Sequence, residues 1–284
     1  MEWTWPRWPI ESEVNMSAKK PLKIMYLNPL GTPDYDELFA EMARSYMRPG
    51  TEVHVTSLPV AAGAFSHIEY RAYEGAVVLG ILRATRAAAA EGFDALAIGC
   101  FYDTGLLDAR EISGGMVITA PCQSACEIAS TLANRFGIIV GRRKWVHQMH
   151  NTVREHGYGD RLSGFYDVGL GVTEFQADHA ETERRLTEAG RKAVEQDHAE
   201  ALILGCTLEV GFYKDLEGHL GVPVIDPSIA ALKRAEYAAG LRRDCGWLPS
   251  RRWSSESPPE AEMTALGVFD SNAAFGNRVV VEAR

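Results

Sequence analysis

The sequence predicts an α/β protein built from two similar doubly wound lobes, each with a parallel sheet, and an active site in the cleft between them. Two observations carry this prediction. The chain contains one pattern twice, because FDALAIGC begins at Phe93 and AEALILGC begins at Ala199. Short apolar runs also alternate with helical segments along most of the 284 residues, which is typical of parallel α/β architecture.

The repeated pattern extends beyond the apolar run. From Cys100 the chain reads CFYDTGLLDARE, and from Cys206 it reads CTLEVGFYKDLE. Each cysteine is therefore followed by an acid at the third position, a glycine at the fifth and a glutamate at the eleventh. This agreement in register indicates a duplicated structural unit, in which each copy ends a central strand on its cysteine.

The individual elements follow from Pro21 onward. LKIMYLN predicts a first strand, PLGTPDYD a turn and ELFAEMARSYM a helix. TEVHVTSL predicts a second strand, the alanine-rich YEGAVVLGILRATRAAAAEGF a helix, and ALAIGC a third strand, apolar throughout as buried parallel strands are. Further strands are expected at GMVIT, FGIIVG, ALILGC and VPVID, and further helices at CEIASTLANR, HAETERRLTEAGRKAVEQ and SIAALKRAEYAAGLR.

These elements divide the chain into four parts. We expect an N-terminal arm at 1–20, a first lobe at 21–118 plus 226–247, a second lobe at 119–225 and a C-terminal tail at 248–284. The arm carries Trp3, Trp5 and Trp8 between prolines. It is either a poorly ordered leader, with Met16 as an alternative start, or a segment that docks on a neighbouring subunit. The Pro/Ser-rich tail is expected to pack across the surface or a partner.

The composition narrows the classes of partner. A net charge of −9 and a pI near 5.4 argue against nucleic acid and anionic membranes, which both need concentrated positive charge. No apolar run reaches the roughly 18 residues of a membrane span, and the N-terminus lacks the layout of a secretory signal. Five cysteines without a disulfide-rich pattern fit a reducing compartment. We expect a cytoplasmic protein that binds a small molecule.

The two repeated cysteines are the strongest candidates for chemistry. Ligands of open α/β sheets bind beyond the carboxyl ends of strands, where Cys100 and Cys206 are placed. We expect a helix N-terminus to lower the pKa of each thiol, and the preceding glycine to let the backbone approach a ligand. Isolated cysteines are most often only buried, but two related thiols facing one carbon can do more. One thiolate removes a proton and the other thiol returns one to the opposite face, with backbone N–H groups and the Thr207 hydroxyl stabilising the enolate.

These segments resemble the aspartate/glutamate/hydantoin racemase superfamily, and most of all its hydantoin racemases. GCFYDTGLLDARE resembles the first catalytic-cysteine segment and LGCT the second. PVIDP, LNP and GAFSHIEYRAYEGA also resemble family segments. The resemblance spans roughly Leu22 to Arg242. It implies two α/β lobes and cofactor-independent racemisation of a carbon acid such as a 5-substituted hydantoin or related cyclic amide.

In the resemblance, Cys100 and Cys206 are catalytic and no metal is needed. The substrate-binding residues it implies are Asn28, His67, Phe101, Tyr102, Gln123, Thr207 and Leu208. Glu69 and Tyr70, next to His67, are further plausible pocket residues. The chain departs from the family pattern at LGTPDY, at APCQ (Ala120 to Gln123) and at Thr104, which replaces a usual proline. Because the first two segments line the pocket in the family, these departures leave the substrate open.

Several alternatives remain open at this point. One is an isomerase, decarboxylase or ring-opening hydrolase of the same superfamily that uses one cysteine, and another is a non-catalytic small-molecule binding protein. A metal site at Cys122, Cys126, His147 and His150 and a phosphate cradle at GLGVTE are weaker readings. Cys245 beside Trp247 is expected to pack. The arm, the tail and the apolar helix GAVVLGILRATRAAAA predict a homo-oligomer, at least a dimer.

Overall fold

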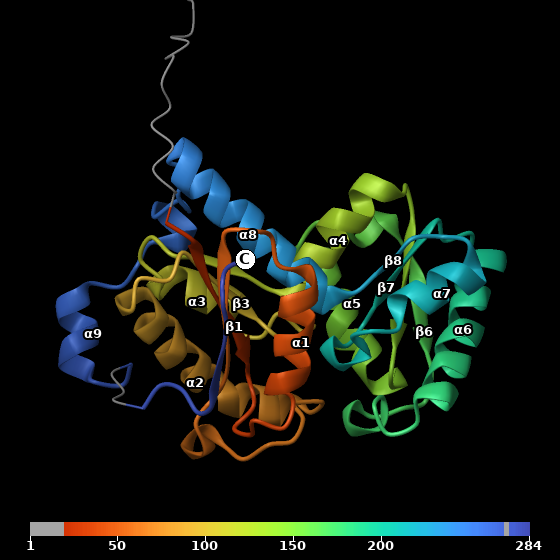
Figure 1. The fold of residues 1–284 in the computed structure, drawn as a ribbon, viewed down its shortest axis with the longest axis horizontal. Coiled ribbons are helices and arrows are strands. Elements are labelled where there is room, and N and C mark those ends of the chain that lie inside the picture. The colour runs from red at the N-terminus through yellow and green to blue at the C-terminus, as the bar shows by residue number, and fades with distance from the viewer. Residues whose placement is uncertain (1–19, 270–272) are drawn as a thin grey trace, which may run out of the picture.

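The computed structural model describes residues 20–269 and 273–284. The predicted arm, with Trp3, Trp5 and Trp8, therefore lies outside the described residues. Two α/β lobes lie side by side, each with a sheet flanked by helices (Figure 1). Within the described part of the chain, no helix is long and apolar enough to cross a membrane.

The sheet of the first lobe has the strand order β4-β3-β1-β2-β9. Its first four strands in sequence run parallel and are almost wholly buried, which agrees with their apolar sequences. The last strand, β9, pairs antiparallel with β2 at the edge of the sheet. The strands are β1 (Leu22–Asn28), β2 (Thr51–Ser57), β3 (Ala95–Ile98), β4 (Val117–Thr119) and β9 (Arg278–Val281).

The sheet of the second lobe is parallel throughout and has the order β6-β5-β7-β8. If each lobe's strands are counted from its own first strand, the parallel strands of the first sheet read fourth, third, first, second. The second sheet, read from β8 to β6, has the same order. The duplication seen in the sequence is therefore a duplication of topology. The strands are β5 (Phe136–Val140), β6 (Leu162–Asp167), β7 (Ala201–Leu204) and β8 (Val224–Ile225). Cys100 and Cys206 follow the equivalent third strands, β3 and β7.

The helices pack against the two sheets or against one another. They are α1 (Asp36–Tyr46), α2 (Arg71–Ala90), α3 (Leu106–Ile112), α4 (Pro121–Leu132), α5 (Val146–Glu155), α6 (His179–Glu195), α7 (Tyr213–Leu220), α8 (Pro227–Cys245) and α9 (Glu260–Leu266). Helix α8 follows β8 of the second lobe but packs on β1, β3 and β4 of the first lobe and on α4 (Figure 1). Asp226 starts this helix, because its Oδ1 accepts the backbone N–H groups of Ser228 and Ile229.

Two strands were not anticipated from the sequence. β6 (LSGFYD) is half-exposed and contains Gly164, so it lacks the continuous apolar run of its neighbours. β9 lies within the segment expected as a tail. Before β9, that segment crosses the first lobe, where Arg251 donates to Ser113 and Glu260 pairs with Arg86. The last strand then completes the first sheet and covers the edge of β2.

Candidate active site

One pocket lies at the carboxyl ends of the central strands of both lobes. Residues that follow β1, β3, β5 and β7 line it, as expected for open parallel sheets. Its empty volume, counted to the open mouth, is about 530 Å³. The wall is largely aromatic, with Tyr35, Phe39, Phe101, Tyr102 and Trp145. A concave and mostly apolar lining of this kind is typical of small-molecule sites.

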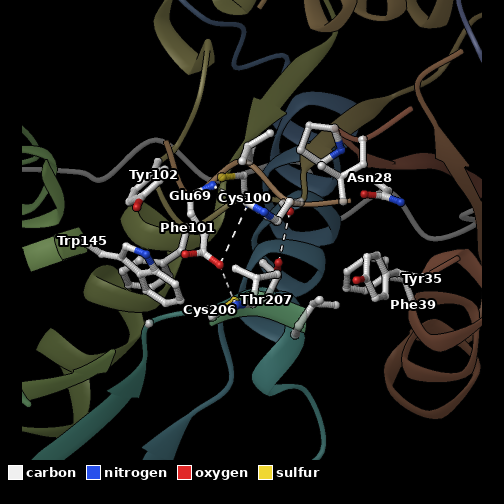
Figure 2. Close-up of a pocket in the computed structure, with 18 of the residues that line it drawn as sticks. Asn28, Tyr35, Phe39, Glu69, Cys100, Phe101, Tyr102, Trp145, Cys206 and Thr207 are labelled. Carbon is white, nitrogen blue, oxygen red and sulfur yellow. Dashed lines mark hydrogen bonds and ion pairs between the residues drawn. The ribbon is translucent and has the colours of Figure 1, made fainter. Parts of the chain in front are cut away.

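The two predicted catalytic cysteines meet in this pocket. Figure 2 shows Cys100 and Cys206 on opposite sides of it, one carried by each lobe. Each residue is 8% exposed. Each sulfur accepts a hydrogen bond from the backbone N–H of the second residue after it, Tyr102 for Cys100 and Leu208 for Cys206. The duplicated sequence thus places the two thiols at equivalent strand ends.

The glycine before each cysteine is required by the neighbouring strand. The Gly99 N–H donates to Leu27 O and the Gly205 N–H to Ile139 O, both at 2.7 Å. A Cβ on Gly205 would lie 2.5 Å from Ile139 O, and one on Gly99 would lie 3.0 Å from Leu27 O. These glycines allow close approach between strands, and both also line the pocket, where we predicted a close approach of the backbone to a ligand.

The repeated glycine and acid have different explanations. Gly105 and Gly211 have φ values of 67° and 101°, so both copies turn through the left-handed region that favours glycine. The acids diverge. Glu209 accepts the N–H of Cys206 in its own turn, whereas Asp103 reaches the second lobe and accepts the N–H groups of Cys122 and Gln123 in the first turn of α4. His156 also lies 2.8 Å from Asp103. Asp103 therefore ties the lobes together beside the pocket.

The expectation that helix N-termini lower the thiol pKa values is wrong for this fold. α3 begins at Leu106, six residues after Cys100, and Cys206 precedes only the single 3₁₀ turn Thr207–Glu209. Burial dominates instead and raises the pKa of Cys100 to about 12. Burial, with Glu209 as the next cause, raises the pKa of Cys206 well above 9.0. Both thiols are therefore protonated in the unliganded site at neutral pH.

Six of the seven predicted substrate-binding residues line the pocket: Asn28, His67, Phe101, Tyr102, Thr207 and Leu208. The seventh, Gln123, lies outside the lining, and its side chain accepts from Arg110. The Thr207 hydroxyl donates to Gly99 O at 3.2 Å, so it links the two cysteine turns and does not point a free donor at a ligand. The Asn28 amide nitrogen donates to Thr32 O and Asp36 Oδ1.

The weaker sequence candidates take structural positions. Cys122 and Cys126 are buried on α4, and the described residues contain no group of three or more side chains that could hold a metal. GLGVTE forms a short 3₁₀ turn whose Val172 N–H donates to Glu69. Cys245 is exposed at the end of α8, so the expected packing is not present.

A model of the Asp/Glu/hydantoin racemase family matches residues 24–235. The chain belongs to this family. The hydantoin racemase of Pseudomonas sp. (strain NS671) is 30% identical over 232 residues, covering 82% of this chain and 92% of the relative. That of Paenarthrobacter aurescens is 30% identical over 242 residues, covering 85% and 99%.

Solved structures agree with the family assignment. Allantoin racemase from Klebsiella pneumoniae has a TM-score of 0.77 at 25% identity, covering 84% of this chain and 94% of its own. Arylmalonate decarboxylase, at 17% identity, has a TM-score of 0.55 over 77% of this chain and 92% of its own, which shows the shared fold alone. The curated relatives are racemases, and this chain is an enzyme of the racemase class.

Several residues that line the pocket of this racemase-family chain were not predicted from its sequence. Trp145 and Met149 come from the segment after β5, and Val172 from the segment after β6. Trp145 follows the carboxyl end of β5, and ligands of parallel sheets bind at such strand ends, so its position after FGIIVG is the sequence signal for it. Glu69, noted beside His67, is the acidic residue of the lining and is 5% exposed. Its carboxylate accepts from Arg142 and Val172, so it joins the lobes at the pocket wall.

Proposed function

We propose that this chain is a cofactor-independent racemase that inverts a carbon next to a carbonyl in a neutral cyclic amide, such as a 5-substituted hydantoin, by proton transfer between Cys100 and Cys206. The observation that carries the proposal is the position of the two thiols, which line one pocket from opposite lobes at equivalent strand ends. The hydantoin racemases among the relatives support the substrate class.

The reaction needs one thiolate and one thiol. The thiolate takes the proton from the substrate carbon, and the electron pair of the broken C–H bond moves onto the carbonyl oxygen. The other thiol then protonates the carbon on the opposite face and becomes the thiolate. Charge and protons balance without a cofactor, and the configuration is inverted.

Because the pKa values of both thiols are raised, forming the thiolate that this mechanism needs costs free energy. With a pKa of about 12, Cys100 is ionised in about one molecule in 10⁵ at pH 7, which corresponds to about 7 kcal/mol. This cost fits within the barrier of roughly 16 kcal/mol that a turnover of about 10 s⁻¹ allows. A thiolate with so high a pKa is also a stronger base toward a weakly acidic C–H bond.

The lining favours a neutral, apolar-substituted substrate. Among the described lining residues there is no arginine or lysine to pair with a carboxylate, and the nearby guanidinium of Arg142 is already paired with Glu69. The aromatic wall of Phe39, Phe101 and Trp145 offers a surface to an apolar ring substituent. Free aspartate or glutamate would have to bury a carboxylate here without a partner, which is costly.

The wall contains a buried N–H group that has no partner among the described residues. This group is the indole Nε1 of Trp145. A buried N–H without a partner is unfavourable unless a ligand satisfies it. We assign this group to a carbonyl oxygen of the cyclic amide. The backbone N–H groups of Phe101 and Thr207, directly after the two cysteines, are the candidates for binding the enolate oxygen.

The test follows single enantiomers in D₂O. The wild-type protein, incubated with one enantiomer of a 5-benzylhydantoin, should lose optical rotation as deuterium enters at the ring carbon. C100S and C206S should each stop racemisation, because a serine hydroxyl is too weakly acidic to act as the base. Each should still exchange the C–H of one enantiomer, and the two variants should prefer opposite enantiomers.

The matched control is C245S, which changes an exposed cysteine at the end of α8 and should leave turnover unchanged. Full racemisation by C100S or C206S would overturn the two-thiol mechanism. Net formation of a new compound by the wild-type protein would instead favour the single-cysteine decarboxylase or hydrolase chemistry. Racemisation of free glutamate at a comparable rate would contradict the neutral-substrate assignment.

A further inference from the structure

The two thiols differ in one side-chain contact. The Thr104 hydroxyl lies 3.5 Å from the sulfur of Cys100 and 3.0 Å from Oε1 of Glu74. Thr104 is 2% exposed, so water does not compete for these contacts. The residue at the same place in the second copy, four positions after Cys206, is Val210, which has no hydroxyl. The duplication therefore supplies a polar partner to Cys100 that Cys206 lacks at this position.

Glu74 is held in place from the other lobe. It lies on α2, and Nε2 of Gln148, on α5, donates to its Oε2. A continuous line of contacts thus runs from the sulfur of Cys100 through Thr104 and Glu74 to Gln148. Neither Thr104 nor Glu74 lines the pocket. These contacts therefore reach Cys100 from the protein interior and not from the ligand side.

The Thr104 hydroxyl has only one hydrogen to donate. While Cys100 is a thiol, that hydrogen satisfies the Glu74 carboxylate, and the thiol S–H can donate to the Thr104 oxygen. When Cys100 is a thiolate, the hydroxyl can turn to donate to the sulfur, which leaves Glu74 with Gln148. The Thr104 hydroxyl therefore points its hydrogen at Glu74 when Cys100 is a thiol and at the sulfur when Cys100 is a thiolate.

We propose that Thr104 is a positioning residue that switches its hydroxyl between Glu74 and Cys100, so that Glu74 favours the thiol form of Cys100 and Thr104 stabilises the thiolate form. The proposal rests on the proposed function for its place in turnover. It makes the two thiols chemically unequal, because the partner of Cys206 is apolar. Thr104 lowers the pKa of Cys100 and Glu74 raises it. These are the directions expected if Thr104 stabilises the thiolate and Glu74 favours the thiol.

The experiment measures the thiol itself, not turnover. In a C206S background, the rate of Cys100 alkylation by iodoacetamide is followed from pH 7 to 9.5 by mass spectrometry of its peptide. At pH values below the pKa, this rate is proportional to the thiolate fraction. T104V should slow alkylation by about ten- to a hundredfold, as expected for losing one hydrogen bond to a charged group. T104S should restore the rate, and E74Q should accelerate it by about tenfold.

The opposite signs of T104V and E74Q separate the switch from a general loosening of the site, which would accelerate both. Because neither residue lines the pocket, the rates report the proton on Cys100 and not reagent access. Alkylation of Cys206, measured in a C100S background, serves as the control and should be unchanged by T104V. Equal rates in T104V, E74Q and their parent would overturn the switch. If these shifts appear while no hydantoin is racemised, the switch stands and the proposed function falls.

Discussion

Replacement of Gly205 by alanine tests whether the glycine before Cys206 exists for strand contact. The added Cβ would lie 2.5 Å from Ile139 O and 2.8 Å from Val140 Cγ1. The first of these is a backbone atom of β5, so the strands must separate, and the 2.7 Å hydrogen bond from Gly205 N to Ile139 O weakens. Overpacking of about 1–3 kcal/mol plus about 1 kcal/mol for the hydrogen bond predicts a loss of roughly 2–4 kcal/mol.

The assay is urea unfolding followed by circular dichroism, with G218A as the matched control. Gly218 lies within α7 and a Cβ there would meet no atom within 4 Å, so alanine should stabilise the protein by about 0.5–1 kcal/mol. G205A should also lower turnover, because the displaced strand end carries Cys206. If G205A loses less than about 1 kcal/mol relative to wild type, the close-contact explanation for this glycine is refuted.

Two further outcomes follow from the structure and one from the sequence. Burial raises the pKa of Asp226 from 3.8 to about 6, so the folded state keeps a proton that the unfolded chain has released, and stability should fall by up to about 3 kcal/mol as pH rises through this window. D226N, which cannot ionise, should lack that decline in urea midpoints between pH 4 and 7, and an equal decline in both proteins would contradict this assignment. W145F should lower kcat/KM for hydantoins by about tenfold while its urea midpoint stays near that of wild type, and an unchanged kcat/KM would remove the indole N–H from substrate binding. Light scattering at micromolar concentration should give at least a dimer, whereas a monomer mass would refute the predicted homo-oligomer.

The sequence was sufficient for the architecture because its signals were local or repeated. Continuous apolar runs such as ALAI (Ala95–Ile98) and ALIL (Ala201–Leu204) predict buried parallel strands, since only such strands need to be apolar on both faces. The repeated cysteine with its glycines predicted two equivalent turns. β6 and β9 escaped prediction because a half-exposed strand and a four-residue edge strand carry little pattern of their own.

The pocket wall depended on contacts between distant segments. Trp145, Phe39 and Val172 belong to different lobes or elements, and only the packing of those elements brings them to one cavity. Gln123 shows the converse. It belongs to the segment from Ala120 to Gln123 that lines the pocket in the family, yet in this fold its side chain accepts from Arg110 outside the lining.

The sequence by itself identified the two candidate catalytic thiols, one at the end of the third strand of each copy. Only the tertiary structure decided the state of those thiols. A cysteine after a strand predicts a thiol near a helix N-terminus with a lowered pKa, but closing two lobes around the site removes water from both sulfurs and raises their pKa values. The physical reason is that topology follows from local apolar pattern, whereas desolvation is a property of the whole enclosure and is set by residues more than 100 positions apart, as in the contact between Thr207 and Gly99.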